Sequence, residues 1–530
     1  MKKNYTLKRK PKYHPLVSVF IFGLTVTLFV QYSCGLSGKK WNNTAHAAPS
    51  QNEIESQPET RTGNLPARKS QGAGLFYPQN QQELYLTVNR LFTESPTLDL
   101  PNVRAVHVPH AGYIYSGKVA AAAIQELPTN FRRVFLLAAN HNGKADFSGV
   151  SIPSVKSYAI PGSEIPLSPI VDDLLKEPLF TSVPEAHTMY MIEVELPFLH
   201  VHSGMQPNPT FSIIPMIAGR LDQNGIEQLS KILNRYADDE TVFIFSADLS
   251  HFYSDSQARQ LDTMTIDAIL SSNQSELARA TTDGNHVLMT MIRLAELNDW
   301  KSTLLQYSNS GETSGDLNKV VGYAAIAFHD PVTFSDEQQN ILLALARNSI
   351  KEYLDSGRTT FSGRARAQKY PILGVPGAVF VTLKKNGRLR GCIGDLVSDK
   401  PLYEGIVKNA VNAATRDTRF KPVTIDELNE LDISISVLGY PQKINALNPK
   451  QYANVLKPGQ DGVIMVYKGR RSTYLPIVWE SLPDPVQFLS RLCIKQGSPA
   501  NCWQSPETTL FRYSAYEFGE KKPELTNGAK

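Results

Sequence analysis

The chain has 530 residues, which is too long for one hydrophobic core and predicts two globular domains with extensions. Apolar residues make up 42% and charged residues 20%, as is typical of a globular protein. The formal net charge is only +4, and much of the basic excess lies in the first twelve residues, so no nucleic-acid-binding surface is expected. Four cysteines are too few for a disulfide framework, and none forms a Cys-x-x-Cys pair, which argues against a thiolate zinc site.

The amino terminus resembles a targeting segment. Basic residues precede an apolar run from Leu16 to Val30, a pattern typical of a secretory signal peptide or an uncleaved membrane anchor. Cys34 stands where a lipoprotein acceptor cysteine would lie, and Ala45-His46-Ala47 offers an alternative cleavage site. We therefore predict that residues 1–36 are a signal peptide or membrane anchor. The rest of the chain is expected to be exported, either membrane-anchored or periplasmic.

The segment that follows is poor in apolar residues. Residues 37–72 are rich in Ser, Gly, Asn, Gln and Pro and show no apolar periodicity. Such a segment cannot bury enough surface to offset its ordering entropy, so it is predicted to be a disordered linker. Globular domains are predicted over 73–331 and 332–524.

The first domain contains several apolar stretches that alternate with helical patterns. The predicted strands are 103–108, 134–139, 211–217, 242–246 and 320–328. Strands that are apolar throughout are covered on both faces, so we predict an α/β domain with a mainly parallel sheet and helices on both faces.

Polar residues follow three of these strands. His110 comes directly after Pro109, His141 follows the next strand, and Asp248 and His251 follow a third. Equivalent ends of parallel strands meet at one edge of the sheet, where open α/β sheets bind ligands. Two imidazoles and a carboxylate at that edge could hold iron or zinc. The alternative is that each histidine only satisfies a backbone group at the end of its strand.

Several motifs in this domain together resemble the Memo family. They are Gly74-Leu75-Phe76-Tyr77-Pro78, Pro109-His110-Ala111-Gly112-Tyr113, Ser246-Ala247-Asp248 with His251, and Val321-Gly322-Tyr323-Ala324-Ala325. The Memo fold is similar to that of LigB-type class III extradiol dioxygenases. The resemblance implies metal ligands at His110 and His141, and it places Asp283 where the family has a ligand cysteine. Two histidines and one aspartate form the ligand set of non-haem iron(II) oxygenases. The alternative is that Asp283 lies in a polar loop and the site is lost.

A second departure from the family lies between His187 and Phe198. The resemblance places Glu193 on a family glutamate, and Glu195 where the family has a histidine. Glu193 could bind substrate or act as a base, or it could be an ordinary carboxylate at a helix terminus. With Asp248 and His251, it is our candidate for orienting the ligands and moving protons.

The second domain mixes helices and strands without regular alternation. Helices are predicted after Ser335, over 401–414 and over 478–494, and strands over 378–383, 389–394, 431–438 and 462–467. Asn386-Gly387 is a strong hairpin signal between the first two strands. The pattern predicts an α+β domain.

Leu389-Arg390-Gly391-Cys392-Ile393-Gly394, together with Asp417-Thr418-Arg419-Phe420, resembles the AMMECR-one family, which has no settled activity. Cys392 could be a catalytic nucleophile whose pKa is lowered by Arg390. The alternative is a small buried thiol between glycines that permit close packing. No histidine occurs in this domain to serve as its base.

Memo-like and AMMECR-one-like proteins are associated with a radical S-adenosylmethionine protein in the three-part AmmeMemoRadiSam system. This chain lacks the CxxxCxxC motif of such an enzyme, so that partner would be a separate protein. An exported chain could hardly meet a cytoplasmic iron–sulfur partner, which counts against a simple transfer of that role.

The sequence therefore predicts an exported or membrane-tethered two-domain protein with a metal-dependent, dioxygenase-like site for a small-molecule substrate. Iron is the expected cofactor, with zinc or copper as alternatives. The rival hypothesis is a non-catalytic adaptor that keeps the dioxygenase fold and binds a ligand or peptide.

Overall fold

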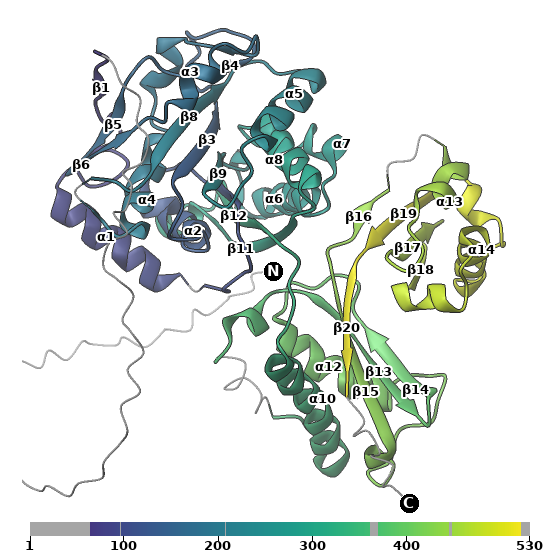
Figure 1. Cartoon of the computed structure of the whole chain (residues 1–530). Coiled ribbons are helices and arrows are strands. Elements are labelled where there is room, and N and C mark those ends of the chain that lie inside the picture. The colour runs from purple at the N-terminus through teal and green to yellow at the C-terminus, as the bar shows by residue number, and fades with distance from the viewer. Residues whose placement is uncertain (1–63, 96, 207, 361–368, 445–447, 521–530) are drawn as a thin grey trace, which may run out of the picture. The chain divides into compact units, whose positions relative to one another are not determined.

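A sheet whose central strands are almost entirely buried forms the centre of the first domain (Figure 1). The computed structural model describes residues 64–520 except 96, 207, 361–368 and 445–447, so the predicted targeting segment lies outside the described residues. The strand order is β10-β12-β2-β9-β3-β8-β4-β7, with β11 paired to β12. Four neighbouring strands are parallel, namely β2 (Ala105–Val108), β9 (Thr241–Ser246), β3 (Arg133–Ala139) and β8 (Ser212–Ala218).

Antiparallel strands flank this parallel centre. On one side β12 (Val320–His329) pairs with β2, β10 (His251–Tyr253) and β11 (Lys301–Asn309). On the other side β4 (Val150–Ser151) pairs antiparallel with β8 and parallel with β7 (Phe180–Thr181). β11 was not predicted, because its residues are mostly half-buried and polar and form no apolar run.

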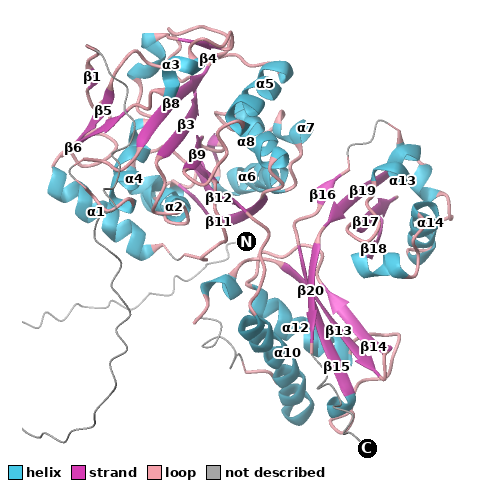
Figure 2. Ribbon diagram, in the orientation of Figure 1, coloured by secondary structure: helices cyan, strands magenta, loops and turns pink. Residues whose placement is uncertain are grey.

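Helices cover both faces of this sheet, as predicted (Figure 2). α1 (Gln81–Glu94), α2 (Tyr113–Ile124) and α4 (Leu196–His202) pack together, and α2 lies against β2, β11 and β12. The other layer contains α5 (Gln223–Asn234), α6 (Asp255–Leu270), α7 (Gln274–Leu277) and α8 (Asn285–Leu297). Shorter helices are α3 (Ile170–Leu174) and α9 (Gly311–Ser314).

α2 begins at Tyr113, immediately after Gly112. Gly112 caps the helix in an extended conformation, so the helix starts directly after the Pro-His-Ala-Gly motif. A Cβ atom on Gly117 would lie 2.9 Å from Leu91 of α1, so glycine permits these two helices to approach closely.

The first domain also begins earlier than its predicted boundary at residue 73. β1 (Ala67–Arg68) pairs with β5 (Ser157–Ile160), which pairs with β6 (Ser163–Pro166) in a separate three-stranded sheet. Residues from Ala67 onward therefore belong to this domain and not to the linker.

The second domain is α+β, as predicted, and has two antiparallel sheets. The first contains β14 (Arg388–Gly394), β13 (Ala378–Lys385), β15 (Leu431–Leu438) and β20 (Ala515–Gly519). Two helices, α10 (Asp336–Ser356) and α12 (Leu402–Thr415), pack against this sheet. The second sheet contains β16 (Gln442–Lys443), β19 (Thr508–Tyr513), β17 (Gly462–Tyr467) and β18 (Arg470–Tyr474).

Two further helices, α13 (Tyr452–Val455) and α14 (Pro485–Lys495), accompany the second sheet. The helix predicted over 478–494 is in fact a 3₁₀ turn, Pro476–Glu480, followed by α14. Pro483 and Pro485 interrupt the pattern, and Asp484 starts the new helix by accepting a hydrogen bond from the backbone of Gln487. Across the described residues, no helix combines the length and the apolar character needed to cross a membrane.

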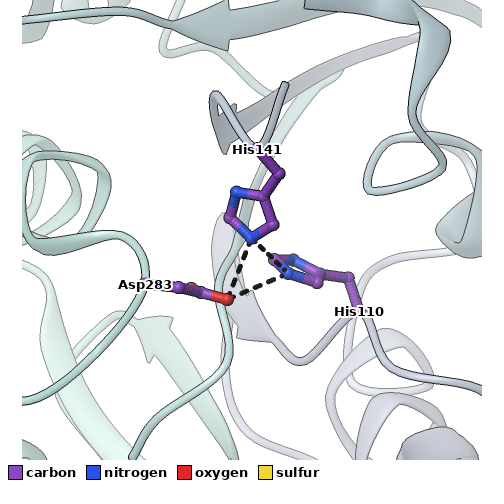
Figure 3. A group of neighbouring side chains, drawn as sticks. All are labelled: His110, His141 and Asp283. Carbon is purple, nitrogen blue, oxygen red and sulfur yellow. Dashed lines mark hydrogen bonds and ion pairs between the residues drawn. The ribbon is translucent and has the colours of Figure 1, made fainter. Parts of the chain in front are cut away.

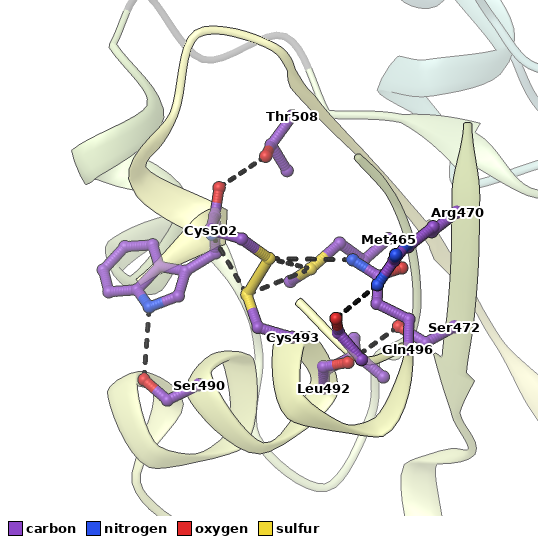
Figure 4. The surroundings of a disulfide bond; sticks show 11 residues. Met465, Arg470, Ser472, Ser490, Leu492, Cys493, Gln496, Cys502 and Thr508 are labelled. Atoms are coloured by element: carbon purple, nitrogen blue, oxygen red, sulfur yellow. Dashed lines mark hydrogen bonds between the residues drawn. A yellow bond between two sulfur atoms is a disulfide. The ribbon is translucent and has the colours of Figure 1, made fainter. Parts of the chain in front are cut away.

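A disulfide joins Cys493 of α14 to Cys502 in the second sheet's subdomain (Figure 4). Both cysteines are buried, and the sulfur of Met465 lies 3.4 Å from each of their sulfurs. The backbone N–H of Trp503 donates to the sulfur of Cys493 at 3.1 Å. The cysteine count had suggested no disulfide framework, and this single bridge was not foreseen.

We expect reduction of this disulfide to lower the free energy of unfolding by about 2–3 kcal/mol, because it closes a loop of about ten residues in the unfolded chain. Denaturant unfolding with and without a reductant measures the effect. The Cys392→Ala variant controls for the free thiol and should show the same loss on reduction. An unchanged unfolding midpoint would contradict the prediction.

Candidate metal centre

Three side chains from distant segments meet at one point (Figure 3). His110 follows β2, His141 follows β3, and Asp283 precedes α8. The Nε2 atoms of the two histidines are 3.2 Å apart. Oδ2 of Asp283 lies 3.1 Å from Nε2 of His110 and 3.0 Å from Nε2 of His141. The fold therefore brings together the three residues predicted as metal ligands.

The spacing of these three atoms suits a single cation. A transition metal about 2.1 Å from each donor holds neighbouring donors about 3 Å apart in an octahedral arrangement. The His110 side chain is only 3% exposed, whereas those of His141 and Asp283 are 21% and 16% exposed. His110 therefore lies in the core, whereas His141 and Asp283 reach solvent.

Asp248 links the loops that carry His110 and Asp283. Its Oδ1 atom accepts a hydrogen bond from the backbone N–H of His110 at 2.9 Å. Its own backbone N–H donates to Oδ1 of Asp283 at 2.9 Å. Thr282 donates its hydroxyl to the backbone carbonyl of Asp248 at 2.6 Å. Asp248 thus fixes the positions of two candidate ligands, and its role here is one of orientation.

His251 lies beside the cluster at a longer distance. Its Nε2 atom is 3.8 Å from Oδ2 of Asp283, and its side chain is 32% exposed. Its Nδ1 atom lies 2.9 Å from the carbonyl of Leu249, which can only accept, so Nδ1 carries the proton. The Nε2 lone pair of His251 is then free on the side of Asp283.

A buried hydrogen-bond chain behind His110 selects its tautomer. Nδ1 of His110 lies 3.0 Å from the hydroxyl of Ser246. That hydroxyl donates toward the carbonyl of Met191 at 3.3 Å and toward Oε1 of Glu195 at 3.4 Å. The hydroxyl therefore accepts from Nδ1–H, so Nε2 is the ring atom that can exchange its proton for a cation at the cluster. The sequence analysis did not assign a role to Ser246, although the residue stands in a motif quoted there.

The charges at the cluster shift one another's pKa values. Burial alone would lower the pKa of His110, but Asp248 and Asp283 raise it to about 9. Burial alone would raise the pKa of Asp283, but the rings of His110 and His141 hold it well below its usual range. Burial raises the pKa of Tyr190, and Asp248 and Asp283 add to that shift. The ring of Tyr190 stacks on that of Phe76, with the ring centroids 3.4 Å apart.

Glu193 is not part of the cluster. Its carboxylate accepts hydrogen bonds from Arg68 at 2.5 Å, Tyr77 at 2.5 Å, Ser70 at 2.7 Å, and the backbone N–H groups of Gly72 at 2.7 Å and Gln71 at 2.8 Å. Burial would raise its pKa, but Tyr77 and Arg68 lower it. The Glu193 carboxylate therefore anchors the first segment of the domain. Its lone pairs are occupied by these donors, which argues against the predicted role in binding substrate or moving protons.

Cys392 in the second domain is half-buried, and burial raises the pKa of its thiol. The predicted activation by Arg390 is wrong. Gly391 pairs with Leu383 and Leu389 with Lys384, so Arg390 is the extra residue of a bulge. Its guanidinium forms a bidentate ion pair with Glu427, in which Nε donates to Oε1 at 2.8 Å and Nη2 donates to Oε2 at 3.0 Å. The geometry favours the alternative of a small thiol in a tightly packed strand.

Two charged residues, Asp417 and Arg419, protect the edge of the sheet at Cys392. β14 is an edge strand, and the backbone N–H of Cys392 donates to Asp417 at 2.9 Å. Arg419 donates to the backbone carbonyl of Cys392 at 3.2 Å and to Asp417 at 2.6 Å. The two side chains satisfy the groups that another strand would otherwise pair with.

The two domains define the class of protein: an α/β domain with a His-His-Asp cluster, followed by an α+β domain. The family model described as Memo-like protein matches residues 68–327, and the AMMECR1 model matches residues 343–518. The chain belongs to the AMMECR1 family and carries a Memo-like domain ahead of that part. Both matches agree with the fusion that the motifs predicted.

Similar curated proteins are archaeal. Protein MK0488 of Methanopyrus kandleri is 39% identical over 194 residues, which are 36% of this chain and 91% of that protein. A protein of Methanothermobacter thermautotrophicus is 35% identical over 187 residues, or 35% of this chain and 96% of that protein. The crystal structure of uncharacterized protein PH0010 from Pyrococcus horikoshii is similar at 33% identity, covering 36% of this chain and 95% of that one, with a TM-score of 0.34.

Glu195 should make the stability of the metal-free protein depend on pH. Burial raises the pKa of Glu195 from 4.5 to about 8, so the folded chain binds this proton more tightly than the unfolded chain. This contribution is fully present below pH 4.5 and is lost as the pH rises to about 8. We expect Glu195→Gln to remove a decline of roughly 3–5 kcal/mol over that window.

Urea unfolding at several pH values, in the presence of a chelator, measures this difference. Glu83→Gln on the exposed face of α1 is the control and should keep the wild-type slope. If Glu195→Gln also keeps the wild-type slope, Glu195 does not hold a proton in the folded protein.

Proposed function

We propose that the first domain binds a divalent metal through His110, His141 and Asp283 and uses it on a small-molecule substrate. The observation that carries this proposal is the convergence of three donor atoms, from segments far apart in sequence, within 3.2 Å of one another. Iron(II) fits two imidazoles and a carboxylate on one face, and zinc or copper are alternatives.

A metal held in this way supplies open coordination positions for substrate and Lewis-acid or redox chemistry, as in dioxygenase-like enzymes. The surrounding residues of the chain have separate tasks. Asp248 keeps His110 and Asp283 in place through backbone hydrogen bonds. His251 is partly exposed, and its Nδ1–H bond to Leu249 holds the ring with Nε2 toward Asp283.

The test is a metal analysis of the full chain, purified anaerobically without added metal. We expect about one or more equivalents of iron in the wild type, and its loss in His110→Ala and Asp283→Ala. His202→Ala is a matched control, because that histidine lies on α4 and contacts the carbonyl of Leu127 instead. Circular dichroism checks that each variant is folded.

A wild-type protein that is folded, free of metal and unable to bind added iron, zinc or copper would overturn the proposal. It would support the ligand-binding or peptide-binding adaptor.

We also propose that the chain is exported. The support is the apolar run Leu16–Val30 after basic residues, together with the buried disulfide between Cys493 and Cys502. Disulfides persist in oxidising compartments and are rare in most cytosolic proteins.

Export predicts that Cys493 and Cys502 are oxidised in cells only when the amino-terminal segment is present. Acid quenching of whole cells, followed by alkylation of free thiols under denaturing conditions and mass spectrometry, should leave both cysteines unlabelled in the full chain. Deletion of residues 2–36 should expose both to the reagent in a reducing cytoplasm. Equal labelling of the two forms would contradict export.

A further inference from the structure

We propose that Asp283 bridges two divalent cations, the second of them held by Asp248, His251 and Asp283. This inference rests on the proposed function, because both cations share Asp283. The ligand atoms of Asp248, His251 and Asp283 lie within 4.8 Å of one another, and those of His110, His141 and Asp283 form a separate group of the same kind. The two groups have only Asp283 in common.

The His251 ring is prepared to bind a cation. Its Nδ1–H donates to the carbonyl of Leu249, so its Nε2 atom presents a lone pair. The carboxylate of Asp283 also presents lone pairs at Oδ2, and the two atoms are 3.8 Å apart, beyond hydrogen-bond distance. Two acceptors that face each other at this distance attract a cation between them.

Asp248 supplies the third donor. The residue is only 4% exposed, and its Oδ1 atom is used by the backbone N–H of His110. Its other oxygen, Oδ2, is the atom that a second cation would take as a ligand, and carboxylate oxygen is a donor that manganese prefers.

Asp283 stands where the Memo family has a ligand cysteine, and a carboxylate is a common bridge between two cations. Oδ1 of Asp283 accepts from the backbone N–H of Asp248, so Oδ2 is the atom that the two cations would share, at the separation of about 3.5–4 Å that is typical of two-metal sites. The first group offers two nitrogens and one oxygen, whereas the second offers one nitrogen and two oxygens. The second position therefore favours manganese, iron or zinc and suits a substrate that presents an oxygen to each cation.

The experiment is a titration of the full-length, chelator-stripped protein with Mn²⁺ alone, followed by equilibrium dialysis and electron paramagnetic resonance. We expect two Mn²⁺ per wild-type chain and a spin-coupled spectrum at saturation. His251→Ala should bind one Mn²⁺, lose the coupling and weaken the second site by more than about tenfold. Asp283→Ala should lose both cations, and His202→Ala should keep both.

The outcomes separate the two proposals. A wild-type chain that binds one Mn²⁺ would overturn the bridge and leave the first metal site intact. A chain that binds none, with iron and zinc also failing to bind, would overturn both. Two Mn²⁺ in His251→Ala with wild-type affinity would place the second cation elsewhere and also overturn the bridge.

Discussion

The arrangement of the candidate site depends on one carboxylate that lies between two imidazoles. The Nε2 atoms of His110 and His141 are 3.2 Å apart, a distance at which two lone pairs repel unless a proton or a cation lies near both. Asp283 supplies the negative charge that such a positive group requires. The carboxylate is itself held by the backbone N–H of Asp248, so its position is set by the fold and not by the imidazoles alone.

This constraint means that protons and metal ions compete for the same place. The two aspartates raise the pKa of His110 to about 9, so the metal-free protein holds a proton at the cluster at neutral pH. The buried chain through Ser246 keeps the other ring nitrogen protonated and thus fixes which atom exchanges its proton for a cation. Metal binding at such a site releases protons and strengthens as the pH rises.

Much of the fold and part of the site were predictable from local sequence patterns. His110 and His141 follow apolar strands that are parallel neighbours of β9, and that placement could be read from the chain. Asp283 precedes a helix rather than follows a strand, so only the family resemblance pointed to it. The true role of Glu193 depends on Arg68, 125 positions earlier, and the disulfide depends on how α14 packs. Such pairings arise from tertiary structure and leave no local signal.

The motif residues of the two domains have different structural roles. In the second domain the glycines of the Leu-Arg-Gly-Cys-Ile-Gly motif have a packing role, since a Cβ atom on Gly391 would lie 2.2 Å from the carbonyl oxygen of Ala413 in α12. Asp417 and Arg419 cover the free edge of the strand that carries the motif. These residues are accounted for by the stability of the sheet, and burial raises the pKa of the thiol between the glycines. In the first domain Asp248 and His251 lie beside the buried charge of Asp283, which sheet stability does not explain. The chemistry of this chain is therefore to be sought at the carboxyl ends of β2, β3 and β9.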